Sequence, residues 1–528
     1  MSDTPATIVH ALAAAAQEEP DRLALRFVAT TGEDLLLSFG DLWRDARRVA
    51  GHLRAEGAIE GHAVVLLLPP GREFVASFFG VLLAGAVPTP LAPPFRQDAL
   101  GAYLGALKPI FASCAPRVFF APDETAAHLA TLAPEARVLS AETALLSDAL
   151  AGAFELPRPE ATAVLQYTSG ANSVPRGIRL SHRAVVANID SIGRALGLGR
   201  DEVALSWLPM FADMGLIGVL LTGIYWRFAQ VHLRPEAFLI KPARWLQAIS
   251  RFGATVSCAP NFAYKLTTRR VLDRELEGVD LSAWRIALVG AERVEPDAMA
   301  AFAERFEPHG LRRGAVVPTY GLAENTLAAT IGVPGEPLAA RALDGEGGPL
   351  VASAGRPMAG QEVRIFDAHD VPLEDGRVGE IVVRSGSLMD GYEGCPDATA
   401  SKLRGGWLRT GDLGALISGE LFVTGRSKPM IIKRGRNYYP DDIERLASSV
   451  LGLPAGAVLA YARDNDATGT EDVVLVAESA ATDDEEARGA ATRALNAELL
   501  QSLGIRADEV IWLPPGETVS ARSRPCAP

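Results

Sequence analysis

Short apolar runs rich in β-branched residues alternate with longer helical patterns through most of this 528-residue chain. Residues 63–70 read Ala-Val-Val-Leu-Leu-Leu-Pro-Pro, which predicts a buried strand that the two prolines stop, and residues 74–86 have the pattern of the helix behind it. Further short runs of this kind begin at Arg137, Ala254 and Arg285. Strands that alternate with helices predict parallel sheets covered by helices, so we expect an α/β fold.

The length predicts more than one domain, because a single hydrophobic core stops growing well below 528 residues. From about residue 351 the strands shorten and lie between Gly-bounded turns, and after about residue 426 strands and helices mix again. We expect a large N-terminal domain, residues 1–426, of parallel-sheet α/β subdomains with a β-rich module at about 351–426. A small mobile α/β domain, residues 427–528, is expected to follow it.

The composition excludes several classes of protein. Hydrophobic residues make up 48% and charged residues 22% of the chain, as in ordinary globular proteins. The net charge of -13 argues against a nucleic-acid partner, since such binding depends on neutralising phosphates. The longest apolar runs, 75–87 and 214–226, are shorter than the roughly 20 residues that span a bilayer. No secretory signal is recognisable at the start, so we expect a cytoplasmic enzyme.

The cysteines give no sign of a disulfide framework or a zinc site. The four of them are widely scattered and show none of the short spacings of metal ligands. Buried or incidental thiols are the expected interpretation for Cys114, Cys258, Cys395 and Cys526.

A loop that could bind phosphate lies between an apolar stretch, 163–165, and a helix expected from Ser181 onward. Residues 166–182 contain small hydroxyl residues and glycines, which leave backbone N–H groups free to converge on an anion. Taken alone, the same composition also fits an ordinary turn.

This loop, Tyr167-Thr-Ser-Gly-Ala-Asn-Ser-Val-Pro-Arg-Gly, resembles the phosphate loop of the adenylate-forming superfamily, Tyr-Thr-Ser-Gly-Ser/Thr-Thr-Gly-x-Pro-Lys-Gly. Three further segments resemble motifs of that superfamily, in the same order along the chain. Residues 318–324 resemble the adenine and metal motif, residues 409–414 resemble the ribose motif, and residues 425–428 resemble the interdomain hinge. Further stretches are closer to one branch, the fatty acyl-AMP ligases; they are residues 206–209, 213–218, 244–251, 259–264, 419–426 and 434–444.

The resemblance implies ATP and Mg²⁺ as cofactors and assigns roles to individual residues. Thr168, Ser169 and Gly170 would contact phosphate, and Glu324, with Thr168, would hold Mg²⁺ through hard oxygen ligands. Arg176 stands where the family has the lysine of this loop. The nucleotide base would lie against Gly290, Ala291, Glu292, Thr319, Tyr320 and Gly321. Asp412 and Arg426 would bind the ribose, and Lys428 matches the hinge about which the small domain swings.

For the acyl chain the sequence offers an apolar set with one acid at its centre, namely Trp207, Met210, Phe211, Asp213, Met214 and Phe262. Ordinary core packing is an equally good interpretation of these side chains.

The chain departs from the family pattern at several positions. Asn172, Ser173 and Arg176 replace the usual threonine, glycine and lysine of the loop. Ala212 stands where acyl-AMP ligases usually have histidine, and Pro429 follows the hinge where an acidic residue is common.

The largest departure is at the C-terminus. Relatives carry a lysine there that reaches the reacting carboxylate and α-phosphate, but this chain has no lysine after Lys433. Arg524 or Arg522 could supply a cation instead, although Arg is not equivalent to Lys at a tight phosphate site. We therefore expect slower adenylation than in typical members.

The sequence therefore predicts a fatty acyl-AMP ligase that activates a medium- or long-chain carboxylic acid and passes it to a separate acyl carrier protein. Residues 325–354, where acyl-AMP ligases often carry an insertion linked to refusing coenzyme A, are shorter than usual, so an acyl-CoA ligase remains an alternative. A second alternative is a repurposed member that binds nucleotide or acyl-adenylate without efficient adenylation.

Overall fold

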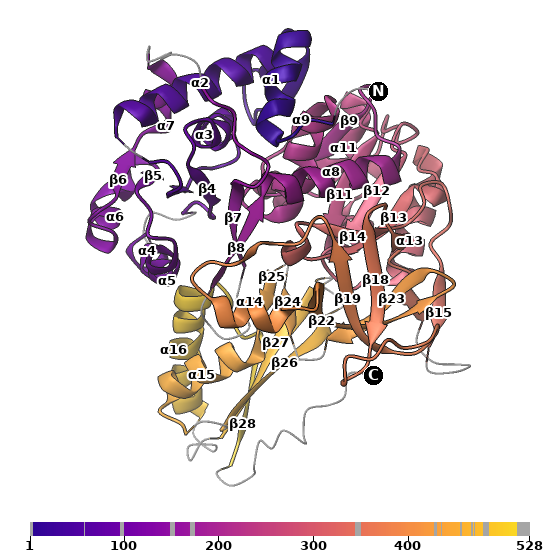
Figure 1. The fold of residues 1–528 in the computed structure, drawn as a ribbon. Coiled ribbons are helices and arrows are strands. Elements are labelled where there is room, and N and C mark those ends of the chain that lie inside the picture. Colours follow the sequence, from indigo (N-terminus) through magenta and orange to yellow (C-terminus); the bar gives the residue numbers. More distant parts are fainter. Residues whose placement is uncertain are drawn as a thin grey trace. The chain divides into compact units, whose positions relative to one another are not determined.

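A computed structural model gives the fold (Figure 1). It describes residues 4–57, 59–94, 100–147, 154–168, 175–343, 350–426, 430–433, 436–454, 457–465, 468, 470–478 and 485–514. The chain forms two compact units. The first comprises residues 1–93, 113–167 and 177–425, and the second comprises residues 94–112, 168–176 and 426–528. Two short segments of the second unit thus come from within the predicted N-terminal domain.

A nine-stranded sheet organises the first unit. Six neighbouring strands of this sheet run parallel, and antiparallel strands close both of its edges. In spatial order the strands are β17 (Arg356–Pro357), β14 (Ala328–Ile331), β13 (Val316–Gly321), β12 (Ile286–Gly290), β11 (Val256–Pro260), β9 (Val203–Ser206), β10 (Ala229–His232), β1 (Leu23–Phe27) and β2 (Leu35–Ser38). The central strand β11 is buried at every residue, as a strand covered by helices on both faces must be. The predicted α/β fold with parallel sheets is confirmed.

A second, four-stranded sheet of the first unit is wholly parallel and contains the strand predicted from residues 63–70. Its order is β4 (Val87–Pro90), β3 (Ala63–Leu66), β5 (Val118–Phe120) and β6 (Arg137–Leu139). The helices of the unit are α1 (Ile8–Glu18), α2 (Phe39–Ala55), α3 (Arg72–Leu83), α6 (Ala126–Leu132), α7 (Ala141–Leu146), α8 (His182–Leu196), α9 (Thr222–Trp226), α10 (Pro235–Ile240), α11 (Ala243–Phe252), α12 (Asn261–Arg270), α13 (Pro296–Phe306) and α14 (Pro396–Lys402). Helices α4 (Leu100–Ala106) and α5 (Lys108–Cys114) lie between β4 and β5 in the chain.

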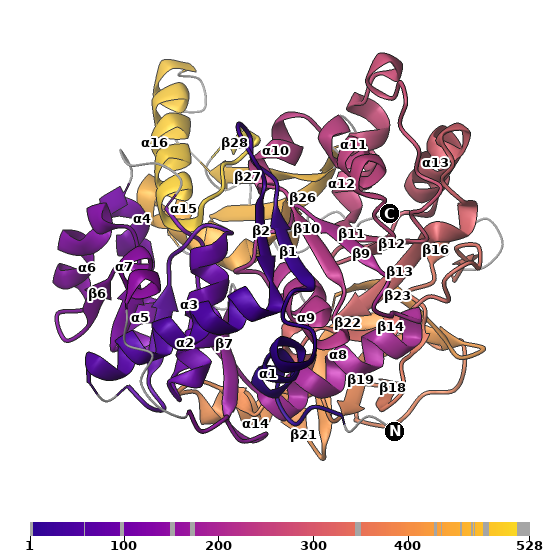
Figure 2. The ribbon, with the colours of Figure 1, turned by 90° about the horizontal axis from the view of Figure 1, so that it is seen from above.

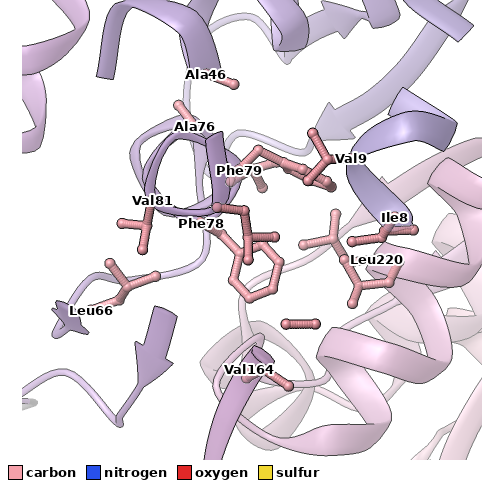
Figure 3. Close-up of a cluster of buried hydrophobic side chains, with 14 of the residues drawn as sticks. Ile8, Val9, Ala46, Leu66, Ala76, Phe78, Phe79, Val81, Val164 and Leu220 are labelled. Carbon is pink, nitrogen blue, oxygen red and sulfur yellow. The ribbon is translucent and has the colours of Figure 1, made fainter. Parts of the chain in front are cut away.

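One hydrophobic core contacts both the nine-stranded and the four-stranded sheet of the first unit. Figure 3 shows Phe78 and Phe79 of α3 beside Val9 of α1 and Leu220. Leu220 belongs to a π-helix, Met214–Leu221, that continues into α9. These contacts account for both long apolar runs of the sequence, because α3 and the π-helix face this core. No helix among the described residues is both long enough and apolar enough to cross a membrane.

The β-rich module is present but is not self-contained. Its own sheet has the order β18 (Gln361–Phe366), β19 (Gly379–Ser385), β22 (Trp407–Ile417) and β21 (Leu403–Arg404), with β23 (Glu420–Arg426) also paired to β22. A small antiparallel pair, β15 (Ala340–Ala342) and β16 (Leu350–Ala352), precedes it. Strand β17 pairs instead with the large sheet, and β20 (Gly391–Tyr392) pairs with β8 (Arg176–Ser181), which follows β7 (Thr162–Thr168). The module is therefore bound into the unit through backbone hydrogen bonds.

The second unit has a core of its own. Its sheet has the order β26 (Val458–Asn465), β27 (Thr470–Glu478) and β28 (Glu509–Leu513), and β24 (Ile431–Lys433) pairs with β25 (Arg436–Tyr438). Figure 2 shows α15 (Pro440–Leu451) and α16 (Glu485–Leu503) side by side. Ile443, Leu475 and Leu495 are fully buried between these elements. Helix α16 begins at Glu485, within the acidic, alanine-rich stretch 481–491.

Two buried histidines make the first unit sensitive to acid. His182 is fully buried and, among the described residues, neither of its ring nitrogens has a hydrogen-bond partner. His232 stacks on Phe27, and its Nε2 lies 3.2 Å from Oε1 of Gln230. Burial lowers the pKa of each histidine from 6.5 to about 3. Both rings are therefore neutral in the folded chain at pH values where they are charged in the unfolded chain.

We expect the free energy of unfolding to fall as the pH drops below about 6.5, by about 1 kcal/mol for each histidine between about pH 7.5 and about pH 5.5. The loss arises because only the unfolded state binds these protons in that range. Urea unfolding at the two pH values measures it. The variants His182→Leu and His232→Phe should each lose less stability on acidification than the parent, whereas His62→Asn, at an exposed position, should match it. Equal losses in all four proteins would contradict the assignment.

Candidate active site

The predicted base and acyl residues lie where the parallel strands of the large sheet end. Trp207 directly follows β9, and Phe262 lies in the first turn of α12, directly after β11. Gly290 is the last residue of β12, and Tyr320 lies at the end of β13. Because neighbouring parallel strands run in one direction, their carboxyl ends share one edge of the sheet. Ligands of open α/β sheets bind at this edge.

The segment after β12 approaches β13 closely. A Cβ atom on Gly290 would lie 2.6 Å from Cγ2 of Thr319, so only glycine fits there without a shift. Ala291 follows with a φ of 64°, a left-handed conformation that is unusual for a residue other than glycine. The carboxylate of Glu292 turns back and accepts a hydrogen bond from the backbone N–H of Phe262, at 2.9 Å. These contacts hold the turn predicted to line the base.

Tyr320 and Asp412 are brought together by a direct hydrogen bond. The phenol of Tyr320 donates to Oδ2 of Asp412 over 2.7 Å, and Asp412, on β22, is only 4% exposed. The hydroxyl of Thr410 accepts a hydrogen bond from the backbone N–H of Asp412, which fixes the backbone between these two residues of β22. The predicted base and ribose residues are therefore neighbours, although they are far apart in sequence. This bond also ties the β-rich module to the edge of the large sheet.

Glu324 lies in the short 3₁₀ helix Ala323–Asn325 that follows β13. Its Oε1 accepts a hydrogen bond from the phenol of Tyr392, at 2.7 Å. Burial raises the pKa of Asp213 above its usual range, and the negative charge of Glu324 adds to the increase. Two predicted site residues, Glu324 and Asp213, are thus close enough for their charges to interact. Sequence reasoning did not single out Tyr392, because a tyrosine among small residues gives no signal of what its hydroxyl contacts.

The Glu324 carboxylate fits the requirements of Mg²⁺. That ion is usually held by one or two carboxylates together with substrate phosphates rather than by a protein cage. Among the described residues, no group of three or more His, Cys, Asp and Glu side chains could hold a metal ion. The single carboxylate of Glu324, together with the phosphate oxygens of ATP, would match the usual ligands of Mg²⁺.

Residues on both sides of the predicted phosphate loop make specific contacts. Tyr167 on β7 donates a hydrogen bond to Oγ of Ser113, at 3.0 Å. Its ring packs on Gly177 of β8, where a Cβ atom would lie 2.8 Å from Cζ of Tyr167. Ser169 and Gly170 lie outside the described residues, as does the side chain of Thr168. Arg176 is the first residue of β8.

The predicted acyl residues divide between two hydrophobic clusters. Trp207 stacks on Phe238, with ring centroids 4.0 Å apart, and meets Phe262 edge to face. Met210 packs instead in the core of α1, α3 and the π-helix. The side chains of Phe211 and Met214 are half-buried, and Met214 packs against the cluster that contains Trp207. Core packing therefore accounts for Trp207 and Met210, and their role toward an acyl chain stays a prediction.

Arg426 lies at the start of the second unit, is exposed and donates to Sδ of Met430 over 3.1 Å. Lys428, Arg522 and Arg524 lie outside the described residues, so their predicted roles stay predictions.

Comparison with known proteins identifies the family. A model of the AMP-binding enzyme family matches residues 12–393. The chain is 36% identical over 507 residues to a 4-hydroxyphenylalkanoate adenylyltransferase of Mycobacterium marinum, covering 88% of this chain and 80% of the relative. It is also 36% identical over 444 residues to the medium-chain-fatty-acid–acyl-carrier-protein ligase JamA of Moorena producens, covering 77% and 74% of the two chains. The chain belongs to the AMP-binding enzymes of the adenylate-forming superfamily.

Solved structures agree with this membership. A fatty acyl-adenylate ligase from L. pneumophila, in complex with acyl adenylate and pyrophosphate, superposes with a TM-score of 0.79 at 29% identity and covers 97% of this chain and 93% of the other. The resemblance to adenylate-forming ligases drawn from the sequence motifs is confirmed, and the chain is a ligase of that family. Its members use ATP and form an adenylate.

The close packing after β12 predicts the effect of a single added carbon. Gly290→Ala should lower the free energy of unfolding by about 1–3 kcal/mol, because the methyl group displaces Thr319 or the turn. It should also weaken AMP binding, since the same turn is predicted to line the base. Thermal unfolding and isothermal titration with AMP measure the two effects. Gly199→Ala is the matched control, because nothing lies within 4 Å of its added Cβ; similar behaviour of the two variants would contradict the prediction.

Proposed function

We propose that the chain is a fatty acyl-AMP ligase. It activates a medium- or long-chain carboxylic acid with ATP, releases pyrophosphate, and transfers the acyl group from the adenylate to the thiol of a separate acyl carrier protein. The observation that carries this proposal is the gathering of Tyr320, Asp412 and Glu324 at the carboxyl edge of the large sheet, each at the position of a family motif. A place in the cytoplasm, as expected from the sequence, stays part of the proposal.

The first half-reaction sets the electrostatic demands on this site. The carboxylate must approach the α-phosphate although both groups are negative, so cations and N–H donors are required to offset the repulsion. Glu324 would hold Mg²⁺ on the phosphates, which supplies positive charge where it is needed. Thr168, Ser169 and Gly170 would provide loop donors, and Arg176 would add a fixed positive charge beside them. Asp412 and Arg426 would hold the ribose, so that the α-phosphate is presented in one orientation.

Two relatives support different acids within this class. JamA is named for medium-chain fatty acids, and the M. marinum protein is named for 4-hydroxyphenylalkanoates. Trp207, Phe238 and Phe262 form an aromatic group beside β9 and β11, which suits either an alkyl chain or an aryl tail. The acid panel for the test therefore contains both kinds.

The acceptor is proposed to be a carrier protein because JamA, at 36% identity, is named as an acyl-carrier-protein ligase. Coenzyme A is the second candidate, since a relative at 34% identity from Caulobacter vibrioides is named as a putative acyl-CoA synthetase. The two acceptors carry the same thiol-bearing arm, so the reaction chemistry does not separate them.

Acid-dependent exchange of pyrophosphate into ATP tests the first half-reaction. We expect measurable exchange with at least one acid of the panel, at a rate below that of typical members because the C-terminal lysine is missing. Glu324→Gln should lower the rate about 100-fold by weakening the hold on Mg²⁺. Arg522→Ala and Arg524→Ala should differ from each other, and the variant with the larger loss identifies the replacing cation.

Two results would redirect the proposal. Exchange at a rate ordinary for the family would contradict the expected slow adenylation. Tight binding of an acyl-adenylate in isothermal titration, without exchange for any acid, would favour a repurposed member that holds the adenylate but does not make it.

The second half-reaction is tested by supplying the purified adenylate with either acceptor. We expect acyl transfer to a phosphopantetheinylated carrier protein and at least tenfold slower consumption of coenzyme A, measured by release of AMP. Equal or faster reaction with coenzyme A would assign the chain to the acyl-CoA ligases.

A further inference from the structure

One short segment of the β-rich module holds both the backbone and the side chain of Glu324. The backbone N–H of Met389 donates to the carbonyl oxygen of Glu324 over 2.9 Å. Three residues later, the phenol of Tyr392 donates to Oε1 of the same glutamate over 2.7 Å. The position of the residue and the orientation of its carboxylate are therefore set by the same piece of chain, residues 389–393.

The opposite side of this segment is joined to the strand that leaves the phosphate loop. Strand β20 pairs antiparallel with β8, with Tyr392 opposite Ile178. The backbone N–H of Glu393 donates to the carbonyl oxygen of Gly177 over 2.7 Å, and its carboxylate pairs with Arg179 at 3.1 Å. Gly177 is also the residue on which the ring of Tyr167 packs. Segment 389–393 thus connects Gly177, at the end of the predicted phosphate loop, to Glu324.

The ring of Tyr392 is itself held firmly. It is 6% exposed and packs in the hydrophobic core of the first unit, and its backbone N–H donates to Oγ1 of Thr399 over 2.9 Å. A phenol that cannot change position directs its hydrogen atom at one place. Because an ionised carboxylate can only accept hydrogen bonds, the Tyr392 hydroxyl is suited to fix one oxygen of Glu324 without neutralising it.

The geometry points to Tyr392 as a positioning residue that orients the Glu324 carboxylate for Mg²⁺ and, through β20, joins it to β8. This inference rests on the proposed function, since it needs Glu324 to be a metal ligand. Hydrogen-bond partners of metal ligands typically change metal affinity or activity by 10–100-fold when removed. A Tyr392 that merely fills the core would affect folding stability and leave the dependence on Mg²⁺ unchanged.

Tyr392→Phe in the full-length chain separates these roles, because it removes the hydroxyl and keeps the ring. We expect the Mg²⁺ concentration that gives half-maximal pyrophosphate exchange to rise about tenfold. Isothermal titration with ATP provides a readout besides activity. The affinity for ATP in MgCl₂ should fall in the variant, whereas the affinity in EDTA should equal that of the parent chain.

Tyr225→Phe is the matched control. The Tyr225 hydroxyl also donates to a carboxylate, Oδ1 of Asp190 at 3.1 Å, and its ring is half-buried in the same unit. Neither residue belongs to the site, so this variant should keep the Mg²⁺ dependence of the parent. If both phenylalanine variants shift it equally, the effect is a general one of stability and the positioning role is wrong.

A second variant tests whether Tyr392→Phe acts through Glu324. Glu324→Asp shortens the carboxylate and withdraws it from the Tyr392 hydroxyl, so it should raise the half-maximal Mg²⁺ concentration by itself. Adding Tyr392→Phe to it should then change this concentration little, because residues acting through one contact are not additive. Additive shifts would overturn the inference.

Failure of the inference and failure of the proposed function are distinguishable in the same titrations. A parent chain whose binding of ATP is unaffected by MgCl₂ contradicts the metal role of Glu324, and with it both proposals. A parent chain that requires Mg²⁺, with a Tyr392→Phe variant that requires it equally, overturns the positioning role alone.

Discussion

The parallel pairing of β10, β9, β11, β12 and β13 is the constraint on which the site depends. Parallel neighbours must share an edge for their carboxyl ends, so the turns after these strands converge whatever their separation in sequence. Residues 207, 262, 290 and 320 are brought to one edge in this way. Strands in such a sheet must be buried on both faces, which explains their near-continuous apolar sequences.

Side-chain hydrogen bonds add connections at this edge of the sheet that backbone pairing does not make. The bond from Tyr320 to Asp412 and the bond from Tyr392 to Glu324 each connect the large sheet to the β-rich module. Both join a phenol to a carboxylate, which orients the acid. In the proposed function these carboxylates would bind metal and ribose, which requires each of them to keep one orientation. Two rigid phenols meet this need better than flexible charged side chains would.

Much of the fold could be predicted because local pattern and burial agree. The strand at residues 63–70 and the helix behind it follow from one apolar run, two prolines and a helical period, and the structure has β3 and α3 there. The pairing of β17 and β20 with distant strands could not be predicted, because it leaves no trace in the local sequence pattern. The hydrogen bond from Tyr392 to Glu324 was missed for the same reason. Motifs placed Glu324, Tyr320 and Asp412 in one function, but only tertiary structure reveals the phenols that connect them. The predicted boundary at residue 426 and the site assignments in the phosphate loop stay predictions.

The missing C-terminal lysine raises the question of whether another lysine of the small unit could take its place, and Lys433 is the last lysine in the chain. Its ammonium group donates to the carboxylate of Asp508 and, over 3.2 Å, to the carbonyl oxygen of Glu471, while Asp472 lies 3.9 Å away. These partners belong to β27 and to the segment before β28, so Lys433 fastens β24 to the sheet of its own unit. Releasing it would remove the ammonium group from Asp508, which is unfavourable for a partly buried carboxylate. Among the residues after Lys433, only arginines could supply a cation for adenylation. The planar, permanently charged group of arginine suits two oxygens at once but occupies more space than an ammonium. The altered phosphate loop, with Arg176 in place of lysine, shows the same exchange. Arg176 keeps the charge of the lysine that it replaces and changes its geometry, which is the physical reason to expect an enzyme that forms its adenylate slowly.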